Sequence, residues 1–295
     1  MTSRSRYTVA FLAGHGVGPE VTAEATRAIG AAARLHGFHV EERHVPYGAD
    51  AFTRFGHPYP ISSRKAVVDA DAVLVAAGTD PLDLEVELDL RASASRVRCE
   101  DAELTLLSPS AEDAWEWTLE RAVALARASR ARLTLVGVTE TWAAHAALVE
   151  ADRDGLEVER LPTAEAMRSL VFTPHRFDVL VCPPELALAA AEVAACTASR
   201  RVTAWGRLAA NGPSVFGAGL DPREEVAGHG VADPKPMLLA AALLLGEGLG
   251  ERRAAATLSA AVGRAAAPGS TRGVADTVLA ALPQALEVEF LREAV

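Results

Sequence analysis

The sequence predicts an α/β protein, because short apolar runs alternate with amphipathic helical patterns along the chain. The clearest unit lies near the start, where the apolar run 9–12 precedes the glycine-rich segment 14–21, GHGVGPEV. Glycines permit a tight turn, and Pro19 suits a first helical turn, where its missing N–H is not needed. We therefore expect a strand, a turn and a helix in this order.

The rest of the chain continues the alternation. Residues 22–35 have the apolar periodicity of a helix, and residues 39–44 and 71–77 are typical of strands. Further helices are predicted at 117–128, 163–171, 187–195, 237–249 and 252–266, and further strands at 132–138 and 177–181. No internal repeat or low-complexity linker interrupts this order.

Composition limits the class of protein. Half of the 295 residues are hydrophobic and 23% are charged, as in a well-buried globular chain of one or two domains. A net charge of −10 argues against a nucleic-acid partner. No apolar run approaches the roughly 18 residues of a membrane span. We expect a cytoplasmic protein, since the first residues precede no apolar segment long enough for export.

The three cysteines are Cys99, Cys182 and Cys196. They are odd in number and unclustered, which suits a reducing compartment and offers no zinc-ligand spacing. We expect Cys182 to pack as a small buried hydrophobe.

Several motifs in the same order resemble the isopropylmalate and isocitrate dehydrogenases, the metal-dependent β-decarboxylating dehydrogenases. Segment 14–21 is similar to their G-D-G-I-G-P-E-V opening, with His15 in place of the aspartate. Segments 71–78 (DAVLVAAG), 176–181 (RFDVLV) and 225–234 (EVAGHGVADP) are similar to two family strands and a family loop. Residues 47–60 resemble the family's G-G-A…T-G-x-P-L-P segment.

The resemblance implies a two-domain fold with an interdomain cleft. Residues 1–96 and 200–295 would form the first domain, and residues 97–199 the second, dimerisation domain. The stretch between Arg98 and Trp115 is shorter than in the family, which implies a reduced dimer arm. Residues 187–195 are apolar almost all round, so this helix should bury against the partner of a two-fold homodimer.

The family's proton-transfer groups are missing from the central domain. The resemblance implies a lysine that removes the hydroxyl proton and a tyrosine that protonates the enol. The only lysines are Lys65 and Lys235, and every tyrosine lies within the first 59 residues. Glu140 stands where the resemblance places the lysine.

The implied metal ligands are also incomplete. The family's three aspartates fall at about Ala164, Leu188 and Glu192, so one carboxylate remains. Magnesium requires octahedral oxygen ligation, for which one carboxylate is a poor site. The resemblance therefore predicts no metal site here.

The substrate arginines of the family fall at about Glu85 and Ser95. A register shift of one residue would restore Arg96, but Glu85 would repel an anionic substrate. Metal-dependent oxidation of a hydroxy-diacid is therefore not expected.

Half of the family's dinucleotide loop remains. Glu225 stands at the acid that the family places on the ribose hydroxyls, and Gly228 and Gly230 are kept. Asp233 replaces an asparagine, and Leu220 replaces the histidine near the adenine. Either a residual NAD site survives, or the glycines preserve a loop that the fold needs.

Several residues are candidates for new chemistry. A carboxylate at Glu140 among apolar neighbours can donate or accept a proton near neutral pH, or it is a solvated charge at a strand end. His15 would face the cleft and titrate near neutrality, or bond the backbone of its turn. Trp142, where the family has an asparagine near the nicotinamide, would form a stacking wall or simply close the cleft. Glu192 would be a remnant of the carboxylates that bind metal in the family.

Three functions remain open. The first is a repurposed enzyme whose cleft does non-redox acid–base or template catalysis on a small, less anionic metabolite, as in specialised metabolism. The second is an NAD-dependent oxidoreductase without metal. The third is a non-catalytic partner, comparable to the regulatory subunits of the isocitrate branch. Fold resemblance alone does not choose among them.

Overall fold

The computed structural model describes residues 6–76, 88–99, 102–151, 155–197, 202–219, 224–265 and 269–293. The chain forms two compact units, residues 1–89 with 204–295 (unit 1) and residues 90–203 (unit 2). The boundary expected after residue 96 falls inside strand β4 (Leu90–Cys99), because this strand continues across it. The boundary expected after residue 199 lies outside the described residues.

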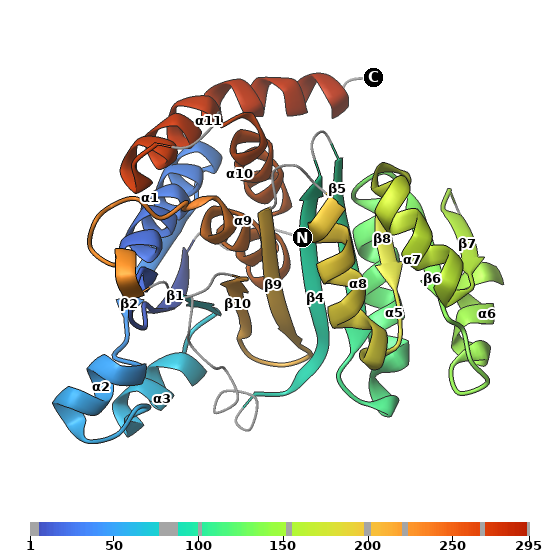
Figure 1. Ribbon diagram of the computed structural model, residues 1–295, viewed down its shortest axis with the longest axis horizontal. Coiled ribbons are helices and arrows are strands. Elements are labelled where there is room, and N and C mark those ends of the chain that lie inside the picture. Colours follow the sequence, from blue (N-terminus) through green and yellow to red (C-terminus); the bar gives the residue numbers. More distant parts are fainter. Residues whose placement is uncertain are drawn as a thin grey trace. The chain divides into compact units, whose positions relative to one another are not determined.

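Unit 1 is built on a largely parallel sheet with strand order β2-β1-β3-β10-β9 (Figure 1). Parallel pairs join β1 to β2 and β3, and β3 to β10, whereas β9 runs antiparallel to β10. The strands are β1 (Arg6–Leu12), β2 (His39–His44), β3 (Ala72–Val75), β9 (Val202–Ala209) and β10 (Ser214–Ala218). Strands β3 and β10 are buried throughout, as expected for central parallel strands covered by helices.

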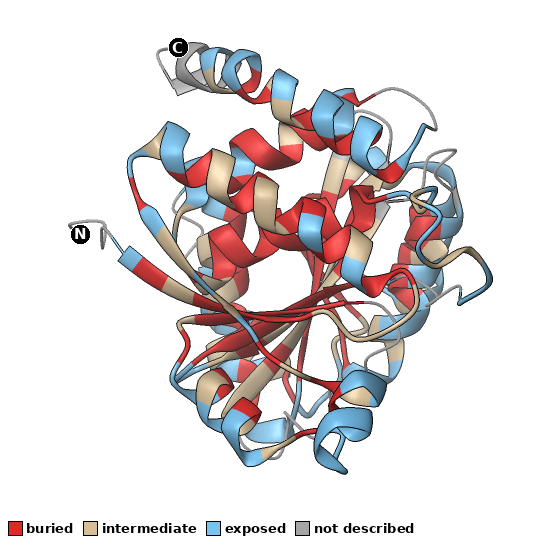
Figure 2. Ribbon diagram, turned by 90° about the vertical axis from the view of Figure 1, so that its left-hand side faces the viewer, coloured by how far each residue is buried: buried red, intermediate tan, exposed pale blue. Residues whose placement is uncertain are grey.

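Helices of unit 1 cover this sheet. They are α1 (Gly18–His36), α2 (Gly48–Phe55), α3 (Ile61–Val68), α9 (Lys235–Leu243), α10 (Arg252–Arg264) and α11 (Thr271–Glu293). Every residue of α9 is buried, and α9 packs against β10. Buried residues are concentrated in the strands and in the helices that lie directly on them (Figure 2).

A π-helical turn, Leu244–Gly248, follows α9 where one continuous helix was expected. Gly248 permits this turn to approach the sheet, since a Cβ there would lie 2.8 Å from the Phe216 ring and 3.1 Å from Ala72. The helical periodicity was thus predicted correctly, but the change of helix type depends on this close packing.

Unit 2 has the strand order β4-β5-β8-β6-β7. An antiparallel hairpin of β4 and β5 (Ala102–Pro109) is followed by three further strands, all parallel to β5. These are β6 (Arg132–Val136), β7 (Glu157–Leu161) and β8 (Val179–Val181). The hairpin includes much of the stretch between Arg98 and Trp115, where the sequence predicted a reduced dimer arm.

Four helices cover the sheet of unit 2 within its described part. They are α5 (Trp115–Arg127), α6 (Ala143–Ala151), α7 (Thr163–Phe172) and α8 (Pro184–Thr197). Residues of α7 and α8 share a core with alternate residues of the strands, including Leu104, Leu106 and Leu180. Helix α5 packs against β5, β6 and β8 and contacts α6 (Figure 1).

Most of the expected elements are present at or near their predicted bounds. The predicted strand 39–44 coincides with β2, and the predicted helix 163–171 is α7. Residue 77 of the predicted strand 71–77 and the turn after it lie outside the described residues. No helix in the described part of the chain is long and apolar enough to cross a membrane.

Candidate functional site

The glycine-rich turn after β1 is held by backbone geometry. Gly14 and Gly16 both have φ of 61°, in the left-handed region that favours glycine. A Cβ at Gly18 would lie 2.1 Å from the Ala13 carbonyl oxygen, so only glycine fits at the first position of α1. The turn brings His15 to Glu224, with 3.5 Å between His15 Nε2 and Glu224 Oε1.

The predicted nucleotide loop lies beside this turn in unit 1. Glu20, in the first turn of α1, accepts a hydrogen bond through Oε2 from the Gly230 N–H at 3.1 Å. Gly228 and Gly230 have φ of 77° and 64°, so both use a conformation that other residues rarely adopt. Two motifs more than 200 residues apart, 14–21 and 225–234, thus form one structural element.

Two of the predicted loop acids have different surroundings. Asp233 Oδ1 accepts a hydrogen bond from the Lys235 N–H at 3.0 Å, and Asp233 Oδ2 lies 3.7 Å from Lys235 Nζ. Asp233 therefore binds the first backbone N–H of α9. Glu225 is exposed, in a short 3-10 turn with Glu224. Leu220, which replaces the family's histidine, lies outside the described residues.

Glu140 lies in unit 2, in the loop between β6 and α6. A turn closed by the hydrogen bond from Trp142 N–H to the Thr139 carbonyl carries its side chain. This side chain is exposed, so Glu140 is a solvated charge after the strand and not a carboxylate among apolar neighbours. Trp142 is fully buried and stacks on Trp115, with ring centroids 4.3 Å apart and planes 5° apart. The aromatic pair thus anchors the turn, and Trp142 presents no surface to a ligand in this conformation.

Arg96 is buried in the β4–β5 hairpin. Its Nε lies 3.4 Å from both Glu103 Oε1 and Thr105 Oγ1, so its charge faces a carboxylate of its own hairpin. Arg98 also pairs with Glu103, at 3.2 Å. Glu85, the other position inferred for a substrate arginine, lies outside the described residues.

The positions inferred for metal ligands lie on two helices of unit 2. Ala164 is exposed in the first turn of α7, and Leu188 and Glu192 are exposed one turn apart on α8. Among the residues that the structure describes, no three His, Cys, Asp or Glu side chains gather as a metal site would require. Glu192 is the single carboxylate in this inferred set, so these residues do not fit a divalent cation.

Cys182, at the end of β8, is buried in the core beneath α8, which confirms its predicted packing role. Burial raises the pKa of its thiol to about 12, and the nearby Glu185 charge acts in the same direction. A thiol this far from ionisation is not a nucleophile near neutral pH.

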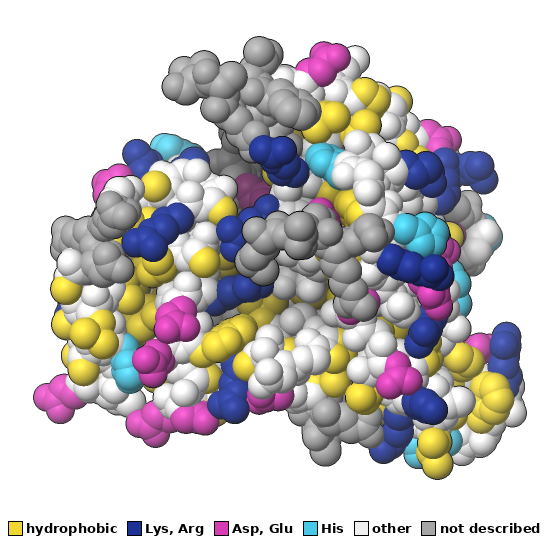
Figure 3. Space-filling view, turned by 180° about the vertical axis from the view of Figure 1, so that it is seen from behind, with side chains coloured by type: hydrophobic (Ala, Val, Ile, Leu, Met, Phe, Trp, Pro, Cys, Tyr) yellow, Lys and Arg dark blue, Asp and Glu magenta, His cyan; other side chains and the backbone are white. Residues whose placement is uncertain are grey.

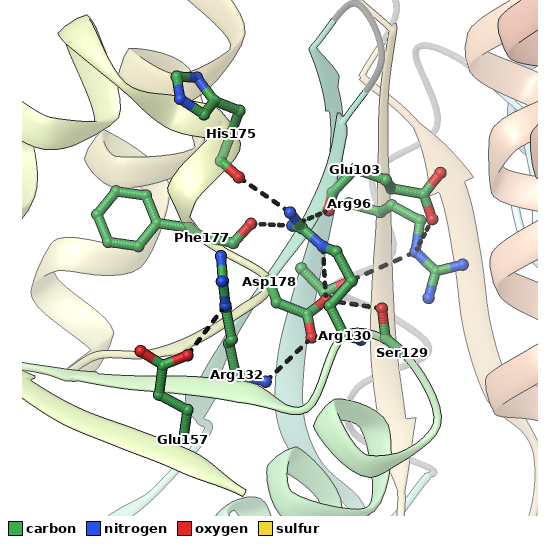
Figure 4. Close-up of polar contacts among 10 residues, drawn as sticks. Arg96, Glu103, Ser129, Arg130, Arg132, Glu157, His175, Phe177 and Asp178 are labelled. Carbon is green, nitrogen blue, oxygen red and sulfur yellow. Dashed lines mark hydrogen bonds and ion pairs between the residues drawn. The ribbon is translucent and has the colours of Figure 1, made fainter.

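One polar network in unit 2 was not singled out from the sequence. The buried carboxylate of Asp178 accepts hydrogen bonds from Ser129 Oγ at 2.7 Å and from the Arg130 N–H at 2.9 Å (Figure 4). The Arg130 guanidinium donates to three backbone carbonyls, those of Glu103, His175 and Phe177. The RFD sequence at 176–178 was the available signal, but only the fold shows that its aspartate ties α5, β6 and β8 together.

The lysines and tyrosines all lie in unit 1. Tyr7 donates a hydrogen bond to Glu251 at 2.7 Å. Tyr47 and Tyr59 are both buried, with ring centroids 5.2 Å apart. Lys65 is exposed on α3.

Charge is mixed on the face of the protein that Figure 3 shows. On this face, basic and acidic side chains are interspersed and form no continuous basic field.

Comparison with known sequences identifies related enzymes. The isocitrate/isopropylmalate dehydrogenase family model matches residues 8–99. The 3-isopropylmalate dehydrogenase of Synechococcus sp. (strain CC9605) is 26% identical, with 91% of this chain and 93% of the relative covered. The Salinibacter ruber enzyme of the same name is 41% identical over a shorter stretch, 28% of this chain and 22% of its own.

Comparison with solved structures supports the same fold. A β-decarboxylating dehydrogenase from Thermococcus kodakarensis, in its apo form, superposes with a TM-score of 0.79 at 21% identity, covering 94% of this chain and 96% of that one. An isocitrate dehydrogenase from Methylococcus capsulatus gives 0.76 at 18% identity, covering 94% and 99%. The α/β fold expected from the sequence is therefore confirmed.

Proposed function

We propose that this chain, which is similar to the isocitrate/isopropylmalate dehydrogenases, is a member of that family without metal-dependent oxidative decarboxylation. One observation carries this proposal: residues 90–203 contain neither a lysine nor a tyrosine. The family resemblance places the base and the acid of the reaction in this part of the chain. No conformational change restores side chains that are absent from the sequence.

The inferred metal ligands support the same proposal. Ala164 and Leu188 carry no donor atom, and Glu192 supplies a single carboxylate. A hydroxy-diacid substrate would also meet Arg96 already paired with Glu103. A ligand with fewer negative charges therefore suits these residues better.

In place of oxidation, we propose acid–base chemistry at Glu140 on a small metabolite. The Thr139–Trp142 hydrogen bond and the Trp142–Trp115 stack hold the turn, while the Glu140 side chain is exposed at its tip. A carboxylate positioned in this way can remove or return a proton without a redox cofactor. His15, whose Nε2 lies 3.5 Å from Glu224 Oε1 in unit 1, is a second titratable residue proposed to contribute to function.

The loss of decarboxylation can be tested directly. Purified protein is incubated with 3-isopropylmalate or isocitrate, NAD⁺ and millimolar Mg²⁺ or Mn²⁺, and NADH formation is followed by absorbance. We expect no NADH above the enzyme-free control. We also expect no rise in melting temperature with metal alone, since a ligand that binds the folded state stabilises it once its concentration exceeds the dissociation constant.

Two results would contradict this proposal. One is metal-dependent NADH formation by the wild-type protein. The other is a clear rise in melting temperature with metal that Glu192→Ala abolishes, which would show that a metal site exists at α8.

For assembly, we propose a two-fold homodimer formed through the helices of unit 2. Phe172 at the end of α7 and Leu188 on α8 are each 75% exposed, and α7 packs against α8. Exposed large apolar side chains on adjacent helices favour a protein interface. In the alternative function, that of a non-catalytic partner, the same surface would bind the other protein.

A second catalytic candidate is an NAD-dependent oxidoreductase without metal. The specific observation in its favour is the 227–233 loop, in which Gly228 and Gly230 have positive φ and the Gly230 N–H bonds Glu20 of α1. Glu225 remains exposed and available for ribose hydroxyls. Calorimetric titration with NAD⁺ distinguishes this candidate, since it requires saturable binding.

A further inference from the structure

Both backbone polar groups of Gly230 are bonded, each to the first turn of a different helix. The Gly230 N–H donates to Glu20 Oε2 of α1 at 3.1 Å, and its carbonyl accepts from the Thr271 N–H of α11 at 2.8 Å. Thr271 adds a second bond, from Oγ1 to the Ala232 carbonyl at 2.7 Å. The loop is therefore held from two sides at its centre.

The two helices that hold the loop are themselves joined. Arg27 of α1 donates to Asp276 of α11 at 2.6 Å and also pairs with Glu24 of its own helix. Ser270 begins α11 by accepting a hydrogen bond from the Gly273 N–H at 3.1 Å. Thr271 thus lies on a helix start that is fixed to α1.

The loop needs such support because of its own composition. The five residues 228–232 include two glycines with positive φ, Gly228 and Gly230. Glycine loses more conformational freedom on ordering than any other residue. Without the helix contacts, a ligand would have to supply the free energy that orders this segment.

We propose that Thr271 and Glu20 are the positioning residues of the 227–233 loop, holding its backbone ready for an adenosine ribose. The ligand part of this inference rests on the dinucleotide loop proposed above as the second candidate function. Neither side chain contacts the ligand. Each acts through the backbone of Gly230 or Ala232.

The chain provides a matched set of variants for Thr271. Thr271→Val keeps the side-chain shape and the backbone N–H but removes the bond to Ala232, and Thr271→Ser keeps both bonds. Thr277→Val is the control, because Thr277 Oγ1 bonds only the Gly273 carbonyl of the same helix, at 3.0 Å. It makes the same chemical change on α11 without a contact to the loop.

The first measurement is amide hydrogen exchange over residues 227–233, with melting temperature to confirm folding. We expect Thr271→Val to speed exchange there about fivefold to tenfold, the effect of one lost hydrogen bond. Thr271→Ser and Thr277→Val should match wild type. Glu20→Leu should speed exchange of the Gly230 amide itself, whereas Glu20→Gln, which keeps an acceptor, should not.

The second measurement is the dissociation constant for NAD⁺ by calorimetry. Thr271→Val should weaken binding about fivefold, with recovery in Thr271→Ser. Unchanged exchange in Thr271→Val, or equal acceleration in Thr277→Val, would overturn the positioning role. Wild-type protein that binds no NAD⁺ but shows the expected exchange pattern would refute the dinucleotide function and leave the positioning role intact.

Discussion

At the scale of the residue, Glu140 carries the proposed chemistry. Its position after β6 follows from the sequence, but its place on a turn anchored by a buried Trp142 does not. A buried aromatic ring beside an exposed carboxylate fixes the backbone and leaves the acid free to meet a ligand. Sequence reasoning left open whether Trp142 forms a stacking wall for a ligand or simply closes the cleft, because a large aromatic residue in a motif gives no sign of its burial.

Replacing Glu140 by glutamine should remove most turnover, about a hundredfold, while ligand affinity and folding are kept. The amide preserves the side-chain shape but neither accepts nor returns a proton. His15→Ala should lower kcat by a smaller factor than Glu140→Gln does. The measurement is kcat with a substrate from a metabolite screen, with the exposed Glu120→Gln as the control.

Full activity in Glu140→Gln would refute the acid–base proposal. Binding or shape alone would then have to explain the activity of the protein.

A second residue-scale prediction concerns Asp178. Asp178→Ala should lower the free energy of unfolding by about 2–4 kcal/mol, because the Ser129 hydroxyl and the Arg130 amide lose a buried charged acceptor. Urea unfolding measures this change, and Glu120→Ala, at an exposed position, should stay within about 0.5 kcal/mol of wild type. A loss for Asp178→Ala no larger than that of the control would show that the network contributes little.

At the scale of the element, the junction of α1 and α10 should make stability depend on pH. His36, in the last turn of α1, lies 3.1 Å from Thr257 Oγ1 of α10. Burial lowers the pKa of His36 below its ordinary value of 6.5, Glu251 opposes this shift and Arg253 adds to it. The unfolded chain therefore binds more protons than the folded chain in mildly acidic solution.

We expect the free energy of unfolding to fall as the pH decreases through about 6.5, and His36→Gln to reduce this dependence. Urea unfolding at a series of pH values from neutral to mildly acidic tests this prediction. His44→Gln is the comparison, since His44 lies exposed on the edge strand β2. An unchanged pH profile in His36→Gln would contradict it.

Element types were the part of the fold that local pattern predicted best. Helix α1 and strand β2 follow from apolar periodicity and a glycine-rich turn, which act over a few residues. The bend into a π-helical turn after α9 was not predicted. It depends on the contact of Gly248 with Phe216, which is distant in the sequence.

At the scale of the whole molecule, the proposed dimer makes a measurable prediction. Light scattering at micromolar concentration should give about twice the 30.9 kDa chain mass. Leu188→Glu should shift the protein toward a monomer, because it places a charge in the apolar surface of α8. Leu148→Glu is the matched control, on α6 and also largely exposed, and should remain dimeric.

A wild-type mass near that of a single chain would contradict the proposed homodimer. Loss of the dimer in both variants would show that the effect is not specific to α8.

The sequence by itself predicted the fold class, the resemblance to the isocitrate/isopropylmalate dehydrogenases and the residue types that are absent from the central part of the chain. Periodicity and turn residues act locally, and the absence of lysine and tyrosine from residues 90–203 holds in any conformation. Only the tertiary structure decided how the candidate residues are used. Asp233 binds the first backbone N–H of α9, Trp142 stacks on Trp115, and Glu20 holds a glycine 210 positions away. These roles depend on contacts between distant segments, which local sequence patterns do not encode.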